Sequence, residues 1–224
     1  MFPELSFLKK IAAEKALDFI EPGMIVGVGS GSTVKMFIEV LSQAKIDVVC
    51  VPTSIDTELM LTKYGLRIAS FLEIEKIDIA IDGADSILLG KNIILKGGGG
   101  ALTREKIIDY TAARLIIIVD ETKINREYPV VVEIVPFAYN FVVNRLKRYG
   151  KPELRISRKK LGPVVTDNGN WLIDLHIPLE AIDGRLEKEI KLIPGVVENG
   201  IFRRDARVII GKKDGGTREI DINA

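Results

Sequence analysis

The chain has 224 residues, 47% of them hydrophobic, and 32 lysines and arginines nearly balance 31 aspartates and glutamates, for a formal net charge of +1. This supply of apolar residues is enough for a packed core, which excludes disorder as the main state. The charge balance argues against a domain that binds nucleic acid, because such domains carry a strongly basic surface.

Histidine and cysteine each occur once, as His176 and Cys50. Zinc sites built from these residue types need several ligands, and a disulfide within the chain needs two cysteines. Zinc sites of these kinds and internal disulfides are therefore excluded. Catalysis must depend mostly on carboxylates, lysines and backbone N–H groups.

No segment of the sequence has the features of a membrane span or a signal peptide. Apolar runs such as Leu115–Val119 and Pro129–Val132 are far shorter than the about 20 residues that cross a bilayer. The first ten residues place their lysines after the apolar residues and lack a cleavage site. We therefore expect a cytoplasmic protein.

The first part of the chain alternates predicted helices with short apolar strands. An apolar stripe spaced by three and four residues over Leu5–Phe19 predicts an opening helix that ends at Pro22-Gly23. The pattern predicts an α/β fold with a doubly wound, mostly parallel, Rossmann-like sheet. The further expected elements are strands over Met24–Val28, Asp47–Val51, Arg67–Ser70, Asp78–Ile81, Ile93–Leu95 and Leu115–Val119, and helices over about 34–41, 55–63 and from 101.

From about Pro129 the pattern changes to runs of strands with two helices, which predicts a second, smaller α+β domain. We expect a catalytic domain formed by residues 1–129 and 205–224, and a small domain over 130–204 with a role in oligomerisation and as a wall of the cleft. The elements expected here are a helix over Phe137–Tyr149, an extended segment over Glu153–Arg158, a hairpin of Val164–Thr166 with Trp171–Ile177, a helix to Leu192, and strands over Val196–Phe202 and Val208–Ile210.

Three glycine-rich segments follow predicted strands. The first, Gly27–Thr33, opens a helix, and unpaired N–H groups and the helix dipole favour an anion there. It does not fit the dinucleotide fingerprint, since serine stands at position 32, nor the P-loop pattern, since no G-x-x-x-x-G-K-[ST] sequence occurs. The segment predicts a phosphate site; a tight turn with a hydroxyl cap is the alternative.

The second segment, Asp82-Gly83-Ala84-Asp85, stands where a parallel strand ends, and ligands of open α/β sheets bind at such ends. Two carboxylates three residues apart can face one cleft, and their mutual repulsion would raise the pKa of one. An ordinary Asp-Gly turn and a magnesium site are the alternatives.

The third segment, Lys96–Lys106, contains four consecutive glycines. Ordering them costs much conformational entropy, so an ordered loop here needs a compensating function. A backbone that wraps around a polar ligand is such a function, and a flexible loop is the alternative. Glu105 falls near the start of the next helix, where the dipole favours its ionised form, so we expect it to act as a base.

The other conspicuous residues have plainer interpretations. His176 falls on the polar side of an alternating strand and is expected at the surface, and Cys50 is expected as a small buried hydrophobic residue. The basic residues Arg155, Arg158, Lys159 and Lys160 are expected in a solvated loop.

Taken together, Gly27–Thr33, Asp82–Asp85, Lys96–Lys106 and Val164–Asn170 resemble the type A ribose-5-phosphate isomerase family over nearly the whole chain. The order Lys-Gly-Gly-Gly-x-Ala-Leu-Thr-Arg-Glu-Lys is the specific part. The resemblance implies interconversion of D-ribose 5-phosphate and D-ribulose 5-phosphate in the pentose phosphate pathway, without a metal or organic cofactor, in a homodimer or homotetramer. Ser30 and Gly100 depart from the family, where many members have threonine and alanine.

The resemblance also implies roles for single residues. Glu105 is the base that moves a proton from C2 to C1 through a cis-enediolate, with Lys96, Asp82 and Asp85 around the reacting carbonyl and hydroxyls. Positive charge near the forming oxyanion is what such a proton transfer needs. The substrate-binding residues by the same comparison are Ser30, Gly31, Ser32, Thr33, Gly83, Ala84, Gly97, Gly98, Gly99, Lys123 and, more weakly, Lys9.

Two other functions are compatible with these residues. A coenzyme A transferase-like enzyme would use the glutamate as a nucleophile. A non-catalytic sensor would bind a sugar phosphate and signal through a DNA reader, which the near-zero charge and the short N-terminal segment disfavour. The expected partner is a small sugar phosphate, with neither nucleic acid nor a membrane.

Overall fold

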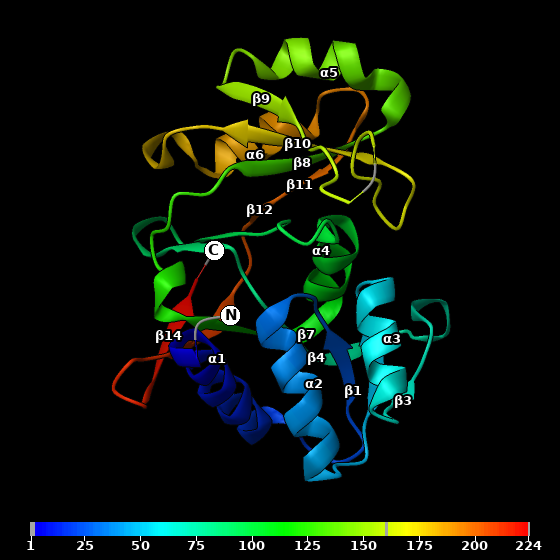
Figure 1. The fold of residues 1–224 in the computed structure, drawn as a ribbon, viewed down its shortest axis with the longest axis vertical. Coiled ribbons are helices and arrows are strands. Elements are labelled where there is room, and N and C mark those ends of the chain that lie inside the picture. Colours follow the sequence, from blue (N-terminus) through cyan, green and yellow to red (C-terminus); the bar gives the residue numbers. More distant parts are fainter. Residues whose placement is uncertain (1–2, 160, 224) are drawn as a thin grey trace. The chain divides into compact units, whose positions relative to one another are not determined.

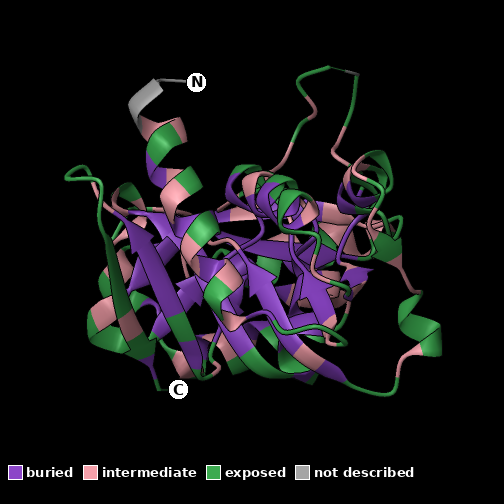
Figure 2. Ribbon diagram, turned by 90° about the horizontal axis from the view of Figure 1, so that it is seen from below, coloured by how far each residue is buried: buried purple, intermediate pink, exposed green. Residues whose placement is uncertain are grey.

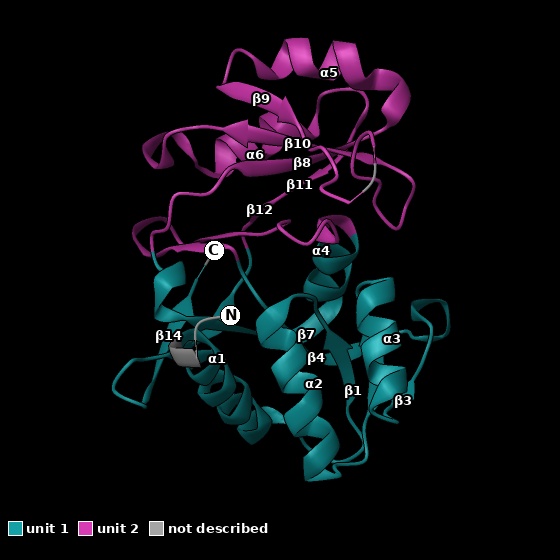
Figure 3. Cartoon of the chain, in the orientation of Figure 1, with its two compact units in different colours: residues 1–84, 104–124, 204–224 teal, residues 85–103, 125–203 magenta. Residues whose placement is uncertain are grey.

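A computed structural model of the chain describes residues 3–159 and 161–223. Contacts divide the chain into two compact units, coloured separately in Figure 3. Unit 1 consists of residues 1–84, 104–124 and 204–224, and unit 2 of residues 85–103 and 125–203. The predicted domain ranges count residues 85–103 with the first domain, whereas the structure groups them with unit 2. The division into a catalytic and a smaller domain stays a prediction.

Unit 1 is built on one seven-stranded sheet with the strand order β14-β13-β7-β4-β1-β2-β3. All neighbours are parallel except β13 and β14, which pair antiparallel at one edge. Without β14 this is the order of a doubly wound dinucleotide-binding sheet, so the predicted fold class is confirmed. The strands are β1 (Ile25–Val28), β2 (Val49–Pro52), β3 (Arg67–Ile68), β4 (Ile77–Asp82), β7 (Ala112–Asp120), β13 (Ala206–Gly211) and β14 (Thr217–Ile222).

Helices cover both faces of this sheet because its strands are apolar on both sides (Figure 1). Val26 and Val28 of β1 pack in one cluster with Phe37 and Leu61 from helices on one face. Gly27 faces the other side, where a Cβ atom would lie 2.5 Å from the Ile108 side chain, so glycine allows that helix to pack closely. The helices are α1 (Pro3–Ala16), α2 (Ser32–Ala44), α3 (Ile55–Lys63) and α4 (Leu102–Thr111), of which α4 begins in the segment that counts with unit 2.

Unit 2 holds two antiparallel sheets, with the orders β11-β8-β10-β9 and β12-β6-β5. Its core packs Val130, Val132 and Ile134 against Leu146 and Ile190, and Figure 2 shows how burial concentrates in the strands of the chain. The strands are β5 (Ser86–Leu88), β6 (Ile93–Leu95), β8 (Val130–Ile134), β9 (Lys151–Leu154), β10 (Trp171–His176), β11 (Val196–Asn199) and β12 (Ile201–Phe202), and the helices are α5 (Tyr139–Leu146) and α6 (Gly184–Lys191). Short 3-10 helices are η1 (Leu17–Phe19), η2 (Phe71–Glu73), η3 (Leu89–Lys91), η4 (Glu121–Lys123), η5 (Pro136–Ala138) and η6 (Leu179–Ala181).

The prediction of one strand over Val196–Phe202 was wrong, because the segment divides into β11 and β12, which belong to different sheets. Gly200 lies between them and exchanges backbone hydrogen bonds with two strands at once: its N–H donates to Val131 O at 2.7 Å, and its carbonyl accepts from Lys96 N at 2.9 Å. A Cβ atom there would lie 2.2 Å from the Lys96 carbonyl oxygen. The glycine therefore permits the change of sheet.

The predicted hairpin around Gly169 is present in part. Thr166 N donates to Asn170 O at 2.9 Å and closes the turn, but its first arm forms only an isolated bridge between Val165 and Trp171. His176 is half exposed at the surface, as predicted.

Cys50 is fully buried in β2, as predicted, and burial raises the pKa of its thiol to about 12. Arg158 and Lys159 are exposed, as predicted, whereas Lys160 lies outside the described residues.

Candidate active site

In unit 1 the predicted site residues follow the carboxyl ends of neighbouring strands. The strand order changes direction between β1 and β4, and ligands of such sheets bind in the crevice at this point. The turn 29–33 follows β1, Asp82 ends β4, and Lys123 follows β7 on η4, where its side chain is half-buried. The topology therefore places these groups at one edge of one sheet.

Asp82 lies underneath the turn that follows β1. Its side chain is fully buried, and Oδ1 accepts hydrogen bonds from Ser30 N at 3.1 Å and Gly83 N at 2.6 Å. A Cβ atom on Gly29 would lie 1.8 Å from the same oxygen, so only glycine fits above the carboxylate. One oxygen of Asp82 thus fixes the shape of the turn.

The N-terminus of α2 is open to an anion. Its N-cap is Gly31 in a left-handed conformation with φ of 98°, which disfavours any residue with a side chain. Because the N-cap is glycine, the alternative of a hydroxyl cap is wrong. Ser32 and Thr33 form the first turn, and Lys9 Nζ donates to Ser32 Oγ at 2.9 Å. N–H groups, hydroxyls and an ammonium therefore meet at one helix end, an arrangement suited to phosphate.

Glu105 lies in the first turn of α4 and is only 4% exposed. Ser30 Oγ donates to its Oε1 at 2.6 Å, which orients the carboxylate toward the turn after β1. A buried, oriented carboxylate of this kind can accept a proton from carbon when the substrate lies beside it.

In unit 2, Asp85 holds the glycine-rich loop that follows β6. Its Oδ2 accepts from Gly98 N at 2.7 Å, and a Cβ atom on Gly98 would lie 2.5 Å from both Asp85 Oδ1 and the Tyr128 hydroxyl oxygen. Burial, assisted by the charge of Asp85, raises the pKa of Tyr128 to about 12. The Tyr128 hydroxyl therefore stays protonated at neutral pH.

The prediction that Arg155 lies in a solvated loop was wrong. Its side chain is 16% exposed, its guanidinium pairs with the carboxylate of Asp174, and Nη1 donates to Gly97 O at 2.8 Å. Asp174 lies on β10, next to the strand that ends one residue before Arg155, so this pair is a cross-strand contact. Gly97 has a φ of 110°, and Gly100 N donates to its carbonyl at 3.1 Å, so the loop is held by its own backbone and by Arg155.

Lys96 follows β6 and is only 3% exposed. Its Nζ lies 5.6 Å from the centre of the Phe202 ring, a cation–π distance, and its backbone N–H donates to Gly200 O. A positive charge on a buried side chain acts more strongly than one at the surface, because protein screens it less than water does.

Among the described residues, hydrogen bonds link predicted site residues to one another: Lys9 to Ser32, Ser30 and Gly83 to Asp82, Ser30 to Glu105, and Gly98 to Asp85. Arg155 and Tyr128 lie against the glycine loop and were not predicted as its supports. The alternation of apolar and polar residues in Trp171–Ile177 could have indicated the role of Arg155. It puts Asp174 on the polar face of the strand, where an oppositely charged residue of the neighbouring strand is expected.

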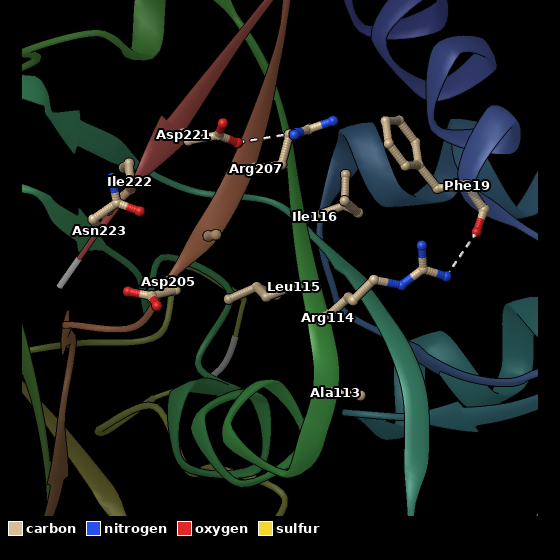
Figure 4. A pocket seen from close by; sticks show the side chains of 11 residues that line it. Phe19, Ala113, Arg114, Leu115, Ile116, Asp205, Arg207, Asp221, Ile222 and Asn223 are labelled. Atoms are coloured by element: carbon tan, nitrogen blue, oxygen red, sulfur yellow. Dashed lines mark hydrogen bonds and ion pairs between the residues drawn. The ribbon is translucent and has the colours of Figure 1, made fainter.

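A separate pocket of about 380 Å³ lies at the other edge of the unit 1 sheet, where β7 and β13 begin (Figure 4). Its charged groups are satisfied by neighbours: Arg207 Nε donates to Asp221 Oδ1 at 3.0 Å, and Arg114 Nη2 donates to the Phe19 carbonyl oxygen at 3.5 Å. None of the predicted site residues lines it.

Comparison with known proteins identifies the family. The family model for ribose 5-phosphate isomerase A (phosphoriboisomerase A) matches residues 49–215. The chain belongs to this family. Ribose-5-phosphate isomerase A of Methanococcus aeolicus is 47% identical over 212 residues, which cover 91% of this chain and 90% of the relative. The Pyrococcus horikoshii protein of the same name is 44% identical, with 95% of both chains covered.

Solved structures of the ribose 5-phosphate isomerase A family have the same fold. The Methanocaldococcus jannaschii enzyme superposes with a TM-score of 0.90 at 37% identity, covering 95% of this chain and 97% of its own. A D-ribose-5-phosphate isomerase in complex with phospho-erythronic acid also has a TM-score of 0.90, at 42% identity, with 96% and 97% covered.

Two further observations concern metals and membranes. Among the described residues, no group of three or more histidine, cysteine, aspartate or glutamate side chains could hold a metal ion. Over residues 3–159 and 161–223, none of the helices is long and apolar enough to cross a bilayer.

Proposed function

We propose that this chain is an aldose-ketose isomerase that interconverts D-ribose 5-phosphate and D-ribulose 5-phosphate in the pentose phosphate pathway. The observation that carries the proposal is the buried carboxylate of Glu105, oriented by Ser30 at the turn where α2 offers a phosphate site. The family supplies the substrate: its members are named for ribose 5-phosphate.

The proposed reaction begins with proton removal. The Glu105 carboxylate takes the proton from C2 of the open-chain aldose, the electron pair forms the C1–C2 double bond, and the carbonyl oxygen becomes the oxyanion of a cis-enediolate. Glu105 then returns the proton to C1, the proton of the C2 hydroxyl passes to the O1 oxyanion to give the C1 hydroxyl, and C2 becomes the ketose carbonyl. One carboxylate is enough for both transfers because the two carbons are adjacent.

The oxyanion and the hydroxyls need partners other than Glu105. Lys96 is proposed to stabilise the oxyanion by its positive charge, together with the backbone of the loop Gly97, Gly98 and Gly99. Asp82 and Asp85, with the backbone of Gly83 and Ala84, are proposed to bind the hydroxyls and to move their protons. Oδ1 of Asp82 and Oδ2 of Asp85 accept backbone hydrogen bonds, which fix the position of both carboxylates.

The phosphate is proposed to bind at the first turn of α2, with Lys9 and Lys123 as its cations.

Replacing both Ser32 and Thr33 by alanine removes two hydroxyl donors, and hydrogen bonds to a charged group contribute about 1.5–3 kcal/mol each. We expect KM for ribose 5-phosphate to rise at least about tenfold while kcat changes little. Steady-state kinetics measure both, with the surface variant His176→Ala as a control that keeps wild-type values. An unchanged KM in the double variant would move the phosphate elsewhere.

The direct test of the function is an assay of purified protein. We expect conversion of ribose 5-phosphate to ribulose 5-phosphate at the same rate with and without EDTA, because the proposed chemistry uses only side chains and backbone. Loss of activity on chelation would contradict the metal-free mechanism, and absence of activity in both assays would contradict the function.

The two alternative functions make different predictions. A coenzyme A transferase-like enzyme would form an acyl-enzyme at Glu105, detectable as a mass increase after incubation with an acyl-CoA. A sensor would bind sugar phosphate without converting it. We expect no mass increase and full conversion, and the relatives described above, all named as isomerases, give neither alternative support.

Oligomeric state and location also stay proposals. We propose a homodimer or homotetramer, which small-angle scattering of the purified protein measures, and a cytoplasmic location, where the substrate's pathway operates.

A further inference from the structure

Glu133 is a fully buried carboxylate of unit 2 that the proposed reaction does not use. It is the fourth residue of β8, with an exposed fraction of 0%. Burying a charge is unfavourable unless hydrogen bonds compensate. Within the described residues it forms no ion pair, so neutral donors must satisfy it.

Four neutral side chains supply these hydrogen bonds. Oε1 accepts from Thr166 Oγ1 at 2.9 Å, Asn170 Nδ2 at 2.8 Å and Asn168 Nδ2 at 3.3 Å, and Oε2 accepts from Thr103 Oγ1 at 2.6 Å. Three of the donors come from the turn 166–170. This turn belongs to Val164–Asn170, a segment that contributes to the family resemblance but has no role in the proposed reaction. The fourth comes from the start of α4.

The contact with Thr103 concerns the catalytic segment directly. Thr103 is the second residue of α4, and Glu105 follows two residues later in the same helical turn. Leu102, which precedes Thr103, is fully buried in a cluster with Val131 and Leu172. Strand β8 thus holds the first turn of α4 by an apolar contact and a short hydrogen bond.

The direction and position of Glu105 depend on that first turn. Its side chain accepts one hydrogen bond from Ser30, but its Cα position is set by the helix that carries it. Misplacing a catalytic group by about 1 Å can cost on the order of a hundredfold in rate. An anchor two residues away is therefore well placed to determine the rate.

We propose that Glu133 is a positioning residue, which acts through the Thr103 hydroxyl to fix the first turn of α4 and so the carboxylate of Glu105. The inference rests on the proposed isomerase function, because it needs Glu105 as the base. In this proposal Glu133 and the turn 166–170 affect the reaction rate by positioning Glu105, without contacting the substrate.

The test is Thr103→Val, which removes the hydroxyl and keeps the shape of the side chain. We expect kcat to fall at least about tenfold while KM and the affinity for phospho-erythronic acid stay within about twofold, because the binding groups are untouched. Thr103→Ser restores the hydroxyl and is expected to recover most of the kcat. Thr111→Val is the matched control, because Thr111 lies on the same helix and its hydroxyl donates only to Ile107 O.

The outcomes separate the inference from the function. Wild-type kcat in Thr103→Val, or an equal loss of kcat and of phospho-erythronic acid affinity, would overturn the positioning role. If Thr103→Val does not fold, Thr103→Ala serves instead, with the same expectation. An inactive wild-type protein would overturn the proposed function and the inference with it, whereas an active wild type with an unaffected variant overturns the inference alone.

Discussion

Replacing Glu105 by glutamine is expected to lower kcat by about a thousandfold, in the range that a general base contributes. Glutamine has the same shape, and its amide oxygen can still accept the hydrogen bond from Ser30 Oγ, so the side chain keeps its place. It cannot take up the C2 proton. We therefore expect phospho-erythronic acid, measured by calorimetry, to bind nearly as tightly to the variant as to the wild type.

The chain provides a matched control for this substitution. Glu58 is the fourth residue of α3, as Glu105 is the fourth of α4, but Glu58 is exposed. Glu58→Gln is expected to keep wild-type kcat. A kcat near the wild-type value in Glu105→Gln would exclude Glu105 as the base and return attention to Asp82 and Asp85.

Most of the unit 1 fold was predictable because its strands and helices are continuous in sequence and carry clear periodicity. The strand over Asp78–Ile81 was predicted from an apolar run and lies between β1 and β7, buried on both faces. β14 was not predicted, because at the sheet edge only Ile222 is buried and, apart from Ile220, the rest of the strand is polar. β5 was missed because its three residues are too few to show a period.

The candidate site was predictable where the chemistry lies in continuous motifs. The hydrogen bond from Ser30 to Glu105 joins residues 75 positions apart, yet both were expected from glycine-rich segments next to strand ends. The supports of the site were not predictable in the same way. Arg155 contacts Gly97, 58 positions away, and Glu133 contacts Thr103, 30 positions away. In the sequence, nothing distinguishes Arg155 from an ordinary surface arginine or Glu133 from an ordinary strand residue. Their contacts exist only because the strands pair.

Replacing Lys96 by methionine has the second largest expected effect, a fall in kcat of about a hundredfold to a thousandfold. Methionine has nearly the length of lysine, and its sulfur can keep a favourable contact with the Phe202 ring, so the fold should be retained. The loss is then the positive charge that stabilises the oxyanion, which develops only after proton removal begins, so KM should change far less than kcat.

Steady-state kinetics measure this difference, and thermal melting shows whether Lys96→Met remains folded. Lys159→Met, a change at an exposed lysine of the same unit, is the control and is expected to behave as the wild type.

Because Glu105→Gln removes the base and Lys96→Met removes the electrophile, the two act on one transition state. The double variant should therefore lose less than the product of the two single losses, since little catalysis remains for the second change to remove. A kcat of Lys96→Met within about threefold of the wild type would show that the oxyanion is stabilised by other groups, with backbone N–H groups of the glycine loop as the next candidates.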